Sequence, residues 1–547
     1  MRATLRNRLY GAMLDRLLRL PPAVTRDIRV TEGIRIGMLD GVDLVADLYQ
    51  PNVPDAPTVL ARTPYGRVGM VSRALAIPYA QRGFNVLIQS VRGSHGGSGG
   101  VFDPFRHEEA DGLATLDWIE KQSWYHGQLF LAGPSYLGYT QWALAIGADD
   151  RVSGLLPAVA LSDARELLYA GGGFFTGLAV QWIHRMTLLE RSAHLADAVE
   201  VIGDRRALRA MWTLPLTDAD RAATGKHVDY YQRWLTTPAD APYWSDRRVH
   251  DRLGRITAPT HIFGCWYDFC LPQQIADYRA MRAAGRDPLL TIGPWAHVDT
   301  EMMAAAVREG LTWFGRLARG EQPERKRVRL FVGGIEQWRE FDAYPPGFVL
   351  GQQWYLHPSA GLAPTEPDTA ATRHFRYDPA DPTPDIGGAT LDGGRSGRKD
   401  QREREYRPDV LTYTGAPLES DYEIIGPVRA DITLRTSASS AGLFVRLCDV
   451  DPTDRSTNVC DGYLHATGLG DGPHTVTVDL WPTAYRFRAG HRPRLQISGG
   501  SFPRFARNTG SGESPLTAVT LTPVDYEIHT GSTITLPANA YAHRADP

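Results

Sequence analysis

The feature that most constrains the fold is a sharp junction between two periodicities at residues 128–146. A short apolar run at 128–133 is followed by the sequence GPSYLG (133–138) and then by a helical pattern over 136–146. A strand that turns directly into a helix is typical of a parallel sheet, because parallel strands need crossover connections that cover the sheet faces. The junction therefore predicts an α/β domain with Ser135 at the carboxyl end of a strand.

The alternation of strand and helix continues on both sides of this junction. Further strand-like or helical runs are found at 58–60, 84–88, 108–122, 260–264, 273–284 and 289–293. Between 160 and 251 helical patterns dominate and aromatic residues cluster, which indicates a helical cap inserted over the edge of the sheet. We therefore expect one α/β domain built from residues 1–159 and 252–320, with the cap at 160–251.

The second half of the chain has a different pattern. After a charge-rich linker at 319–327, short alternating strands are separated by turn residues, and long helical periods are absent. This pattern predicts an all-β sandwich over 325–547. The stretch 360–406 is rich in Pro, Gly, Asp and Arg, so we expect a long mobile connection there. Residues 1–20 read as an amphipathic helix lying on the protein.

Composition excludes several classes of function. The 547 residues carry a formal net charge of -3, which gives no reason to expect a nucleic-acid partner. No window approaches the ~20 apolar residues of a membrane span, so we expect no membrane association. Four cysteines without metal-site spacing predict free thiols and a cytoplasmic location, and no metal or cofactor is expected. These cysteines are Cys265, Cys270, Cys448 and Cys460.

Two further polar residues follow predicted strands in the order that acyl-transfer chemistry needs. The strand at 260–264 leads into Asp268, and the strand at 289–292 leads into His297. A serine at a strand-to-helix turn is inert without a base, and the base needs an acid to orient it. A lone loop aspartate is usually solvated and a lone histidine is usually structural, but the ordered triple favours catalysis. Ser135, Asp268 and His297 are therefore predicted as nucleophile, acid and base.

These segments resemble a known family. The matching motifs are Arg62-Thr63-Pro64-Tyr65, GPSYLG at 133–138, GCWYD at 264–268, GPWAH at 293–297, CDVDP at 448–452 and SFPRF at 501–505. Together they resemble the cocaine-esterase-like (CocE/NonD) hydrolases, a group related to X-Pro dipeptidyl-peptidases and α-amino-acid ester hydrolases. The resemblance extends from about Ile34 to the C-terminus. It implies an α/β-hydrolase domain with a helical cap insert, followed by a C-terminal jelly-roll-like β-sandwich.

The resemblance also implies roles for individual residues. It makes Ser135, Asp268 and His297 the catalytic triad, with the Tyr65 phenol and the backbone N–H of Tyr136 as the oxyanion hole. Without it, Tyr65 would be interpreted as a core tyrosine. Two positions depart from the family pattern. Many relatives have an aspartate before a V-R-G segment, where this chain has QSVRG at 89–93, so an internal contact to Arg92 is in doubt. Cys265 stands where relatives often have glycine, and its larger side chain could narrow the pocket.

The expected activity is hydrolysis of carboxylic esters through an acyl-enzyme, without a cofactor. Aromatic residues are candidate substrate contacts, namely Trp142, Phe174, Phe175, Trp182, Trp266 and Phe269. Because no acidic cluster lies beside the turn at Ser135, small uncharged acyl esters are favoured as substrates over α-amino esters and peptides. The alternatives are an amidase or peptidase with the same triad, and a catalytically silent binding protein on a hydrolase scaffold. A homodimer is left open by the sequence.

Overall fold

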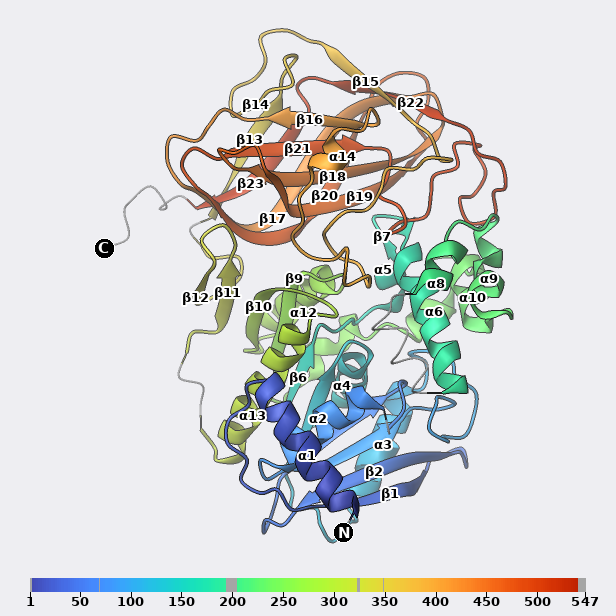
Figure 1. The fold of residues 1–547 in the computed structure, drawn as a ribbon, viewed down its shortest axis with the longest axis vertical. Helices are drawn as coiled ribbons and strands as arrows, with labels where there is room; N and C mark the ends of the chain where they lie inside the picture. The colour runs from blue at the N-terminus through green and yellow to red at the C-terminus, as the bar shows by residue number, and fades with distance from the viewer. Residues whose placement is uncertain (1, 68, 193–203, 322–324, 348, 540–547) are drawn as a thin grey trace.

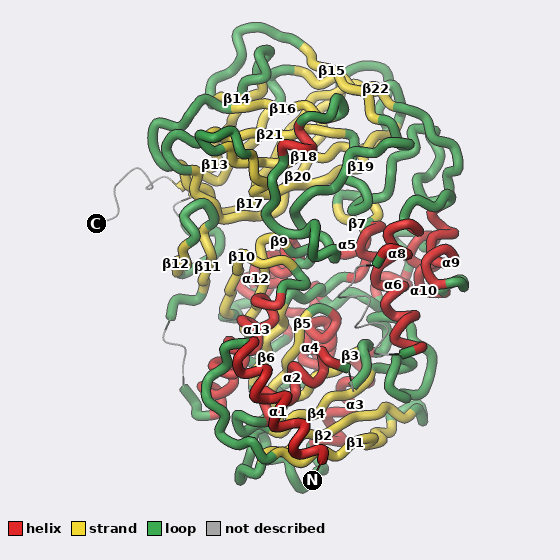
Figure 2. Tube along the Cα trace, viewed as in Figure 1, coloured by secondary structure: helices red, strands yellow, loops and turns green. Residues whose placement is uncertain are grey.

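The chain folds into an α/β half and an all-β half with a helical cap between them (Figure 1). The computed structural model describes residues 2–67, 69–192, 204–321, 325–347 and 349–539. Helices cover the sheet of the α/β half and make up most of the cap, whereas strands fill the other half (Figure 2). This confirms the predicted succession of an α/β domain and a β-sandwich.

The α/β half is built on one mixed sheet with the strand order β1-β2-β4-β3-β5-β6-β9-β10-β11-β12. Its strands are β1 (Ile28–Gly37), β2 (Asp43–Pro51), β3 (Thr58–Thr63), β4 (Asn85–Ser90), β5 (Leu129–Pro134), β6 (Gly154–Ala158), β9 (His261–Tyr267), β10 (Leu289–Ala296), β11 (Val328–Val332) and β12 (Gln337–Phe341). From β4 to β11 all neighbouring strands are parallel, and the antiparallel pairs lie toward the two edges.

Helices cover both faces of this sheet, and two apolar cores lie beneath them. The helices are α1 (Arg2–Leu17), α2 (Met70–Ala80), α3 (Glu108–Ile119), α4 (Tyr136–Gly147), the 3-10 helix η2 (His250–Arg255), α12 (Leu271–Ala283) and α13 (Thr300–Ala318). Helices α3, α4 and α12 share one core, and α1, α2 and α13 share the other. The strands buried between them are nearly continuous apolar runs, as expected for a parallel sheet covered on both faces.

The cap is inserted between β6 and β9. It consists of α5 (Ala164–Leu168), the two-stranded hairpin β7 (Tyr169–Ala170) and β8 (Gly173–Phe174), α6 (Thr176–Arg191), α8 (Arg205–Ala210), η1 (Leu216–Asp218), α9 (Ala219–Thr224), α10 (Asp229–Thr236) and α11 (Pro242–Ser245). The cap also packs on the β half, because Phe175 stacks on Phe505 with ring centroids 5.3 Å apart. The backbone N–H of Ala506 donates to the carbonyl of Phe174 at 2.8 Å.

The β half is a sandwich of two antiparallel sheets around a third core. One sheet has the order β14-β13-β23-β17-β22-β15, with β20 also paired to β17, and the other has the order β16-β21-β18-β19. The elements are β13 (Val349–Leu356), β14 (Leu362–Ala363), β15 (Thr372–Tyr377), α14 (Arg402–Glu405), β16 (Val410–Thr414), β17 (Tyr422–Thr436), β18 (Ser440–Val450), β19 (Ser456–Thr467), β20 (His474–Phe487), β21 (Arg492–Ser498), β22 (Val524–His529) and β23 (Thr533–Asn539).

Two sequence-based boundaries are corrected by the structure. Residues 328–332 fall inside the predicted sandwich of 325–547, but they form β11, which pairs in parallel with β10 and extends the α/β sheet. Its alternating pattern misled the prediction because the strand lies toward the edge of that sheet. The stretch 360–406 is not a bare connection, since it contains β14, β15 and α14. Its buried Asp385, Gln401 and Arg404 tie it to the sandwich.

The smaller predictions can also be compared with the structure. All four cysteines are free thiols, as predicted, and all four are buried. The N-terminal helix α1 buries Leu14 and leaves Met13 half exposed, in keeping with an amphipathic helix on the surface. Among the described residues no helix is both long enough and apolar enough to cross a membrane.

Candidate active site

Ser135 stands at a strained turn between β5 and α4. Its backbone angles are φ 59° and ψ -122°, a conformation that non-glycine residues adopt only under tertiary constraint. Two glycines make room for the turn. A Cβ on Gly133 would lie 2.5 Å from the Cβ of Leu137, and a Cβ on Gly138 would lie 2.4 Å from the Cβ of Ala160. In the usual G-x-S-x-G pattern the second glycine stands two residues after the serine. Here it stands three residues after Ser135, at 138, because this is the position where a Cβ would collide with Ala160.

Backbone hydrogen bonds hold the turn against the sheet. The N–H of Ser135 donates to the carbonyl of Ala158 at the end of β6 at 2.9 Å. The carbonyl of Ser135 accepts from Gly138 and Tyr139 within the first turn of α4. Tyr136 is the first residue of that helix, where backbone N–H groups have no partner within the helix. The turn therefore presents the serine hydroxyl together with a backbone donor.

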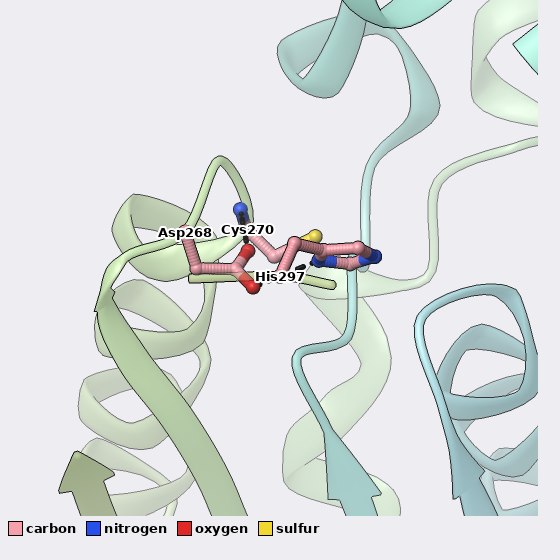
Figure 3. A group of neighbouring side chains, drawn as sticks. All are labelled: Asp268, Cys270 and His297. Atoms are coloured by element: carbon pink, nitrogen blue, oxygen red, sulfur yellow. Dashed lines mark hydrogen bonds and ion pairs between the residues drawn. The ribbon is translucent and has the colours of Figure 1, made fainter. Parts of the chain in front are cut away.

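Asp268 and His297 lie on loops at the ends of the adjacent strands β9 and β10. The Nδ1 atom of His297 is 2.8 Å from Oδ2 of Asp268. The other carboxylate oxygen, Oδ1, accepts a hydrogen bond from the backbone N–H of Cys270 at 2.6 Å. Figure 3 shows the carboxylate directed at the imidazole. Asp268 is fully buried and His297 is 8% exposed, so water cannot readily compete for this contact.

The Cys270 thiol lies in the same group, and Asp268, Cys270 and His297 offer ligand-type atoms within 4.8 Å of one another. A metal would require the thiolate form of the cysteine. Burial raises the pKa of the Cys270 thiol well above its ordinary value, which disfavours that form. The carboxylate and the imidazole are already hydrogen-bonded to each other. The arrangement suits an acid that orients a base better than it suits a metal centre.

Ser135 and His297 open into one cavity of about 670 Å³ between the sheet, the cap and the β half. Its wall is formed by Tyr65, Phe105, Pro134, Ser135, Tyr136, Leu137, Leu161, Leu167, Leu168, Leu178, Ala179, Gln181, Trp182, Arg185, Asp204, Leu208, Trp234, Phe269, His297, Val298, Met302, Met303, Leu391, Asp392, Gly393 and Gly394. Most of these side chains are apolar. A cavity of this size can enclose a small organic molecule.

The two residues expected to hold an oxyanion differ in how they could act. Tyr65 lies on the cavity wall, and its hydroxyl accepts a hydrogen bond from Nε1 of Trp182 at 3.3 Å. The phenol of Tyr136 is buried and donates to Oε1 of Glu108 at 2.7 Å, so its hydroxyl is engaged in the core. Only the backbone N–H of Tyr136 can therefore contribute to the cavity.

The six aromatic residues predicted to contact substrate fall into two groups. Trp182 and Phe269 line the cavity, and the Phe269 ring lies 4.1 Å from the His297 ring, measured between centroids. The other four pack in apolar cores away from the cavity wall. They are Trp142, Phe174, Phe175 and Trp266. Phe175 supports the site indirectly, because its ring makes a T-shaped contact with the ring of Phe269, with centroids 6.0 Å apart.

The cavity wall includes residues that sequence reasoning missed. Val298 follows His297 directly and could have been found from that position. Gln181 and Arg185 lie on α6, the same helix as Trp182, so helical spacing was an available signal. Residues 391–394 come from the β half, in the stretch that was predicted to be a mobile connection. No local pattern in that stretch indicates that it returns to the cavity.

The two departures from the family pattern have structural consequences away from the cavity wall. Before the V-R-G segment, Oγ of Ser90 donates to the carbonyl of His95 at 3.1 Å, and Oε1 of Gln89 accepts from Nε of Arg62 at 2.8 Å. Arg92 pairs with Asp111 at 2.6 Å. Cys265 is buried in the core under α13 and is not among the residues of the cavity wall, so it does not narrow the cavity as expected.

Comparison with known proteins shows which family models and relatives the chain matches. The X-Pro dipeptidyl-peptidase (S15 family) model matches residues 40–299, and the model of the X-Pro dipeptidyl-peptidase C-terminal non-catalytic domain matches 323–543. The chain is 30% identical to a cocaine esterase of Rhodococcus sp. (strain MB1 Bresler), over 88% of this chain and 93% of that protein.

Solved structures show that the fold is shared over nearly the whole length. An α-amino acid ester hydrolase superposes with a TM-score of 0.81 at 19% identity, covering 95% of this chain and 98% of that one. A CocE/NonD family hydrolase from Staphylococcus aureus superposes with a TM-score of 0.70 at 17% identity, covering 93% and 94%.

The fold and these relatives define an α/β-hydrolase, and the chain is an enzyme of the serine esterase class that hydrolyses carboxylic esters. Within that class, the chain belongs to the cocaine-esterase-like (CocE/NonD) family, whose catalytic and C-terminal regions match those of the X-Pro dipeptidyl-peptidases.

Proposed function

We propose that Ser135, His297 and Asp268 act as a catalytic triad that hydrolyses small, uncharged carboxylic esters through an acyl-enzyme. The observation that carries this proposal is that Ser135, at the strained turn between β5 and α4, and His297 line the same cavity. His297 is held by the buried carboxylate of Asp268 at 2.8 Å. An activated serine needs both a base and a group that orients the base, and this site supplies them on three strand ends.

The residues perform the reaction in two steps. His297 removes the proton of the Ser135 hydroxyl as its oxygen attacks the ester carbonyl, and Asp268 stabilises the imidazolium that forms. The imidazolium then protonates the departing alcohol, which leaves the acyl group on Ser135. In the second step His297 takes a proton from water, the resulting hydroxide attacks the acyl carbonyl, and the acid is released. The serine regains its proton from His297.

The negative charge of each tetrahedral intermediate would be stabilised by Tyr65 and by the backbone N–H of Tyr136. Both residues line the cavity beside Ser135. A tyrosine phenol stays protonated at neutral pH and can donate a hydrogen bond in both steps. Preorganised donors of this kind each contribute about 10²–10³-fold to the rate. The Tyr136 donor is rigid because it belongs to the first turn of α4.

The cavity wall supports an uncharged substrate. Among the described residues of the wall two are carboxylates, Asp204 and Asp392, and both accept hydrogen bonds within the protein. Asp204 Oδ2 lies 2.6 Å from Nδ1 of His184 and its Oδ1 accepts from Ala207, while Asp392 accepts from the backbone N–H of Gly394. Both oxygens of Asp204 are therefore occupied, and Asp392 stands alone at the hairpin tip without a second carboxylate beside it among the described residues of the wall. This favours neutral acyl esters over α-amino esters and X-Pro peptides.

The test is a panel of p-nitrophenyl acyl esters assayed with the wild-type protein and with Ser135→Ala, with a fluorophosphonate probe applied to both. We expect turnover and labelling of the wild type only, and faster turnover of neutral esters than of aminoacyl esters and X-Pro p-nitroanilides. Preference for the aminoacyl ester or the anilide would replace the substrate assignment with the peptidase alternative. Equal turnover by the Ser135→Ala variant would refute the triad.

A further inference from the structure

The cap helix α6 contacts the proposed oxyanion donor through two side chains that lie three residues apart. Trp182 and Arg185 both line the cavity, and this spacing places them on the same face of the helix. Nε1 of Trp182 lies 3.3 Å from the hydroxyl of Tyr65. The guanidinium carbon of Arg185 lies 5.5 Å from the centre of the Tyr65 ring, within the range of a cation–π contact.

The chemistry of the two groups decides the direction of the hydrogen bond. An indole N–H can only donate, so the hydroxyl oxygen of Tyr65 must be the acceptor. The single proton of the phenol is then directed away from the indole. A hydroxyl that accepts one hydrogen bond also becomes a stronger donor in the next, because hydrogen bonds in a chain polarise one another.

We propose that Trp182 is a positioning residue for the oxyanion hole, which orients the Tyr65 hydroxyl so that its proton points at the developing oxyanion. This inference rests on the proposed role of Tyr65. It gives Trp182 a function beyond that of an apolar wall for substrate. It also places one determinant of the catalytic rate in the cap rather than in the α/β domain.

The surroundings of Trp182 hold the indole in the orientation that this role requires. Its ring stacks on Tyr136 with an interplanar angle of 7° and a centroid distance of 6.4 Å. Further rings pack around it, those of Phe102 at 6.0 Å, Tyr230 at 5.7 Å and Trp234 at 5.7 Å. Because the Tyr136 phenol is itself fixed by Glu108, the indole is held from a rigid part of the α/β domain.

The experiment removes the N–H donor without removing the ring. Trp182 is replaced by phenylalanine and, in a second protein, by 3-benzothienylalanine, which keeps the bicyclic shape and lacks the N–H. Each change is made in the wild type and in Tyr65→Phe, and kcat and KM are measured with the best neutral ester. Trp234→Phe serves as the matched control, because Trp234 is a cap tryptophan on the same wall that packs against Trp182.

We expect both Trp182 replacements to lower kcat by roughly 3- to 10-fold, the value of one hydrogen bond, with little change in KM. In the Tyr65→Phe background the same replacements should cause no further loss of kcat. Trp234→Phe should have the same effect in both backgrounds. Inhibition by a trifluoromethyl ketone, whose adduct carries an oxyanion, should weaken in parallel with kcat.

Two results would overturn the inference. Equal losses in both backgrounds, or a change confined to KM, would make Trp182 a substrate wall only, while the proposed function would stand. An unchanged kcat in Tyr65→Phe itself would remove Tyr65 from the oxyanion hole and the Trp182 inference with it. The Ser135→Ala assay is independent of both outcomes. If Trp182→Phe fails to fold, the benzothienylalanine protein still tests the role of the Trp182 N–H, because it preserves the packing of the ring.

Discussion

Individual residues in this site are shaped by tertiary constraint more than by local preference. Ser135 adopts a positive φ that a serine rarely takes, and it does so because the sheet and α4 hold the turn from both sides. Asp268 is fully buried, and each of its carboxylate oxygens accepts one hydrogen bond. A buried carboxylate with two donors is a rigid acceptor, which is what a histidine needs in order to keep one tautomer and one orientation.

The Asp268→Asn substitution tests that orienting role. An asparagine keeps the shape but can present an N–H to Nδ1, which favours the wrong imidazole tautomer. In a triad of this kind the same change lowers kcat by about 10⁴-fold. We expect a loss of that order in ester hydrolysis, with an unchanged circular dichroism spectrum. Asp287→Asn, at a surface carboxylate, is the control and should retain activity. A loss below ten-fold for Asp268→Asn would contradict the assigned role.

A second prediction at this scale concerns the glycine behind the serine. Gly138→Ala places a Cβ at 2.4 Å from the Cβ of Ala160, where neither backbone can yield easily. Overpacking of this kind lowers the free energy of unfolding by about 1–3 kcal/mol. We also expect a loss of activity, because the turn that carries Ser135 would shift. The control is Gly315→Ala in α13, where the nearest atom is Nη1 of Arg319 at 3.5 Å. It should stabilise the helix by up to about 1 kcal/mol. Chemical denaturation and ester hydrolysis measure both effects.

Among the elements, the cap is attached where the chain leaves and re-enters the α/β half. The carbonyl of Ser162, after β6, accepts from the backbone N–H groups of Val249 and His250, so the two connecting segments are joined. The buried carboxylate of Asp277 on α12 then binds both segments. Its Oδ1 accepts from the Ser162 hydroxyl at 2.6 Å and lies 2.7 Å from Nδ1 of His250. This cluster fixes the base of the cap relative to the sheet.

The cap attachment should depend on pH through His250. The hydrogen bond to Asp277 raises the pKa of His250 above its ordinary value. The stability that protonated His250 contributes is therefore fully present below pH ~6.5, the ordinary histidine value, and is lost as the pH rises through the raised pKa.

The measurement is the melting temperature of the wild type and of His250→Gln between pH 6 and pH 9. The wild type should be the more stable protein at pH 6, and the difference should shrink as the pH rises. His374→Gln, an exposed histidine on β15, is the matched control and should leave the pH dependence unchanged. A difference that is constant across this range would show that His250 does not titrate against Asp277.

At the scale of the whole molecule, the β half completes the cavity of the α/β half. Residues 391–394 form the tip of a hairpin closed by reciprocal backbone hydrogen bonds between Gly388 and Gly397, and a Cβ on Gly393 would lie 3.4 Å from Val298. Buried charges hold this hairpin. Arg446 donates to the carbonyl of Gly387 at 3.2 Å and to Asp461 at 2.9 Å, and Arg504 donates to Asp461 at 2.6 Å.

Removing the shared carboxylate tests this connection between the sandwich and the site. Asp461→Asn removes the carboxylate that both buried guanidinium groups contact most closely, and leaves Arg446 with Asp385 at 3.7 Å. Breaking a buried ion pair in this way costs about 3–5 kcal/mol. We expect a lower denaturation midpoint and a higher KM for esters, because the hairpin loses its anchor. The control is Asp525→Asn, which breaks an exposed pair with Arg376 and should cost at most about 1 kcal/mol. An unchanged KM would show that the hairpin is held without the buried charges.

Much of the α/β fold was predictable from local pattern. The periodicity changes at 128–146 and the apolar runs before Asp268 and His297 locate real strands, because a buried parallel strand needs a continuous apolar run and a crossover helix needs its own period. The prediction was wrong at one edge of the α/β sheet. The strand at 328–332 alternates like a sandwich strand, and only its pairing with β10 assigns it to the α/β sheet.

The order of Ser135, Asp268 and His297 and their places at the ends of three strands could be predicted from the sequence, since strand, turn and helix patterns are local properties. The tertiary structure alone decided that Asp268 and His297 are in contact and that Trp182 reaches Tyr65. It also brought residues 391–394 to the cavity and kept Trp142 and Trp266 away from it. The physical reason is that side-chain contacts between distant segments depend on how sheet, cap and sandwich pack, and packing is a property of the whole chain.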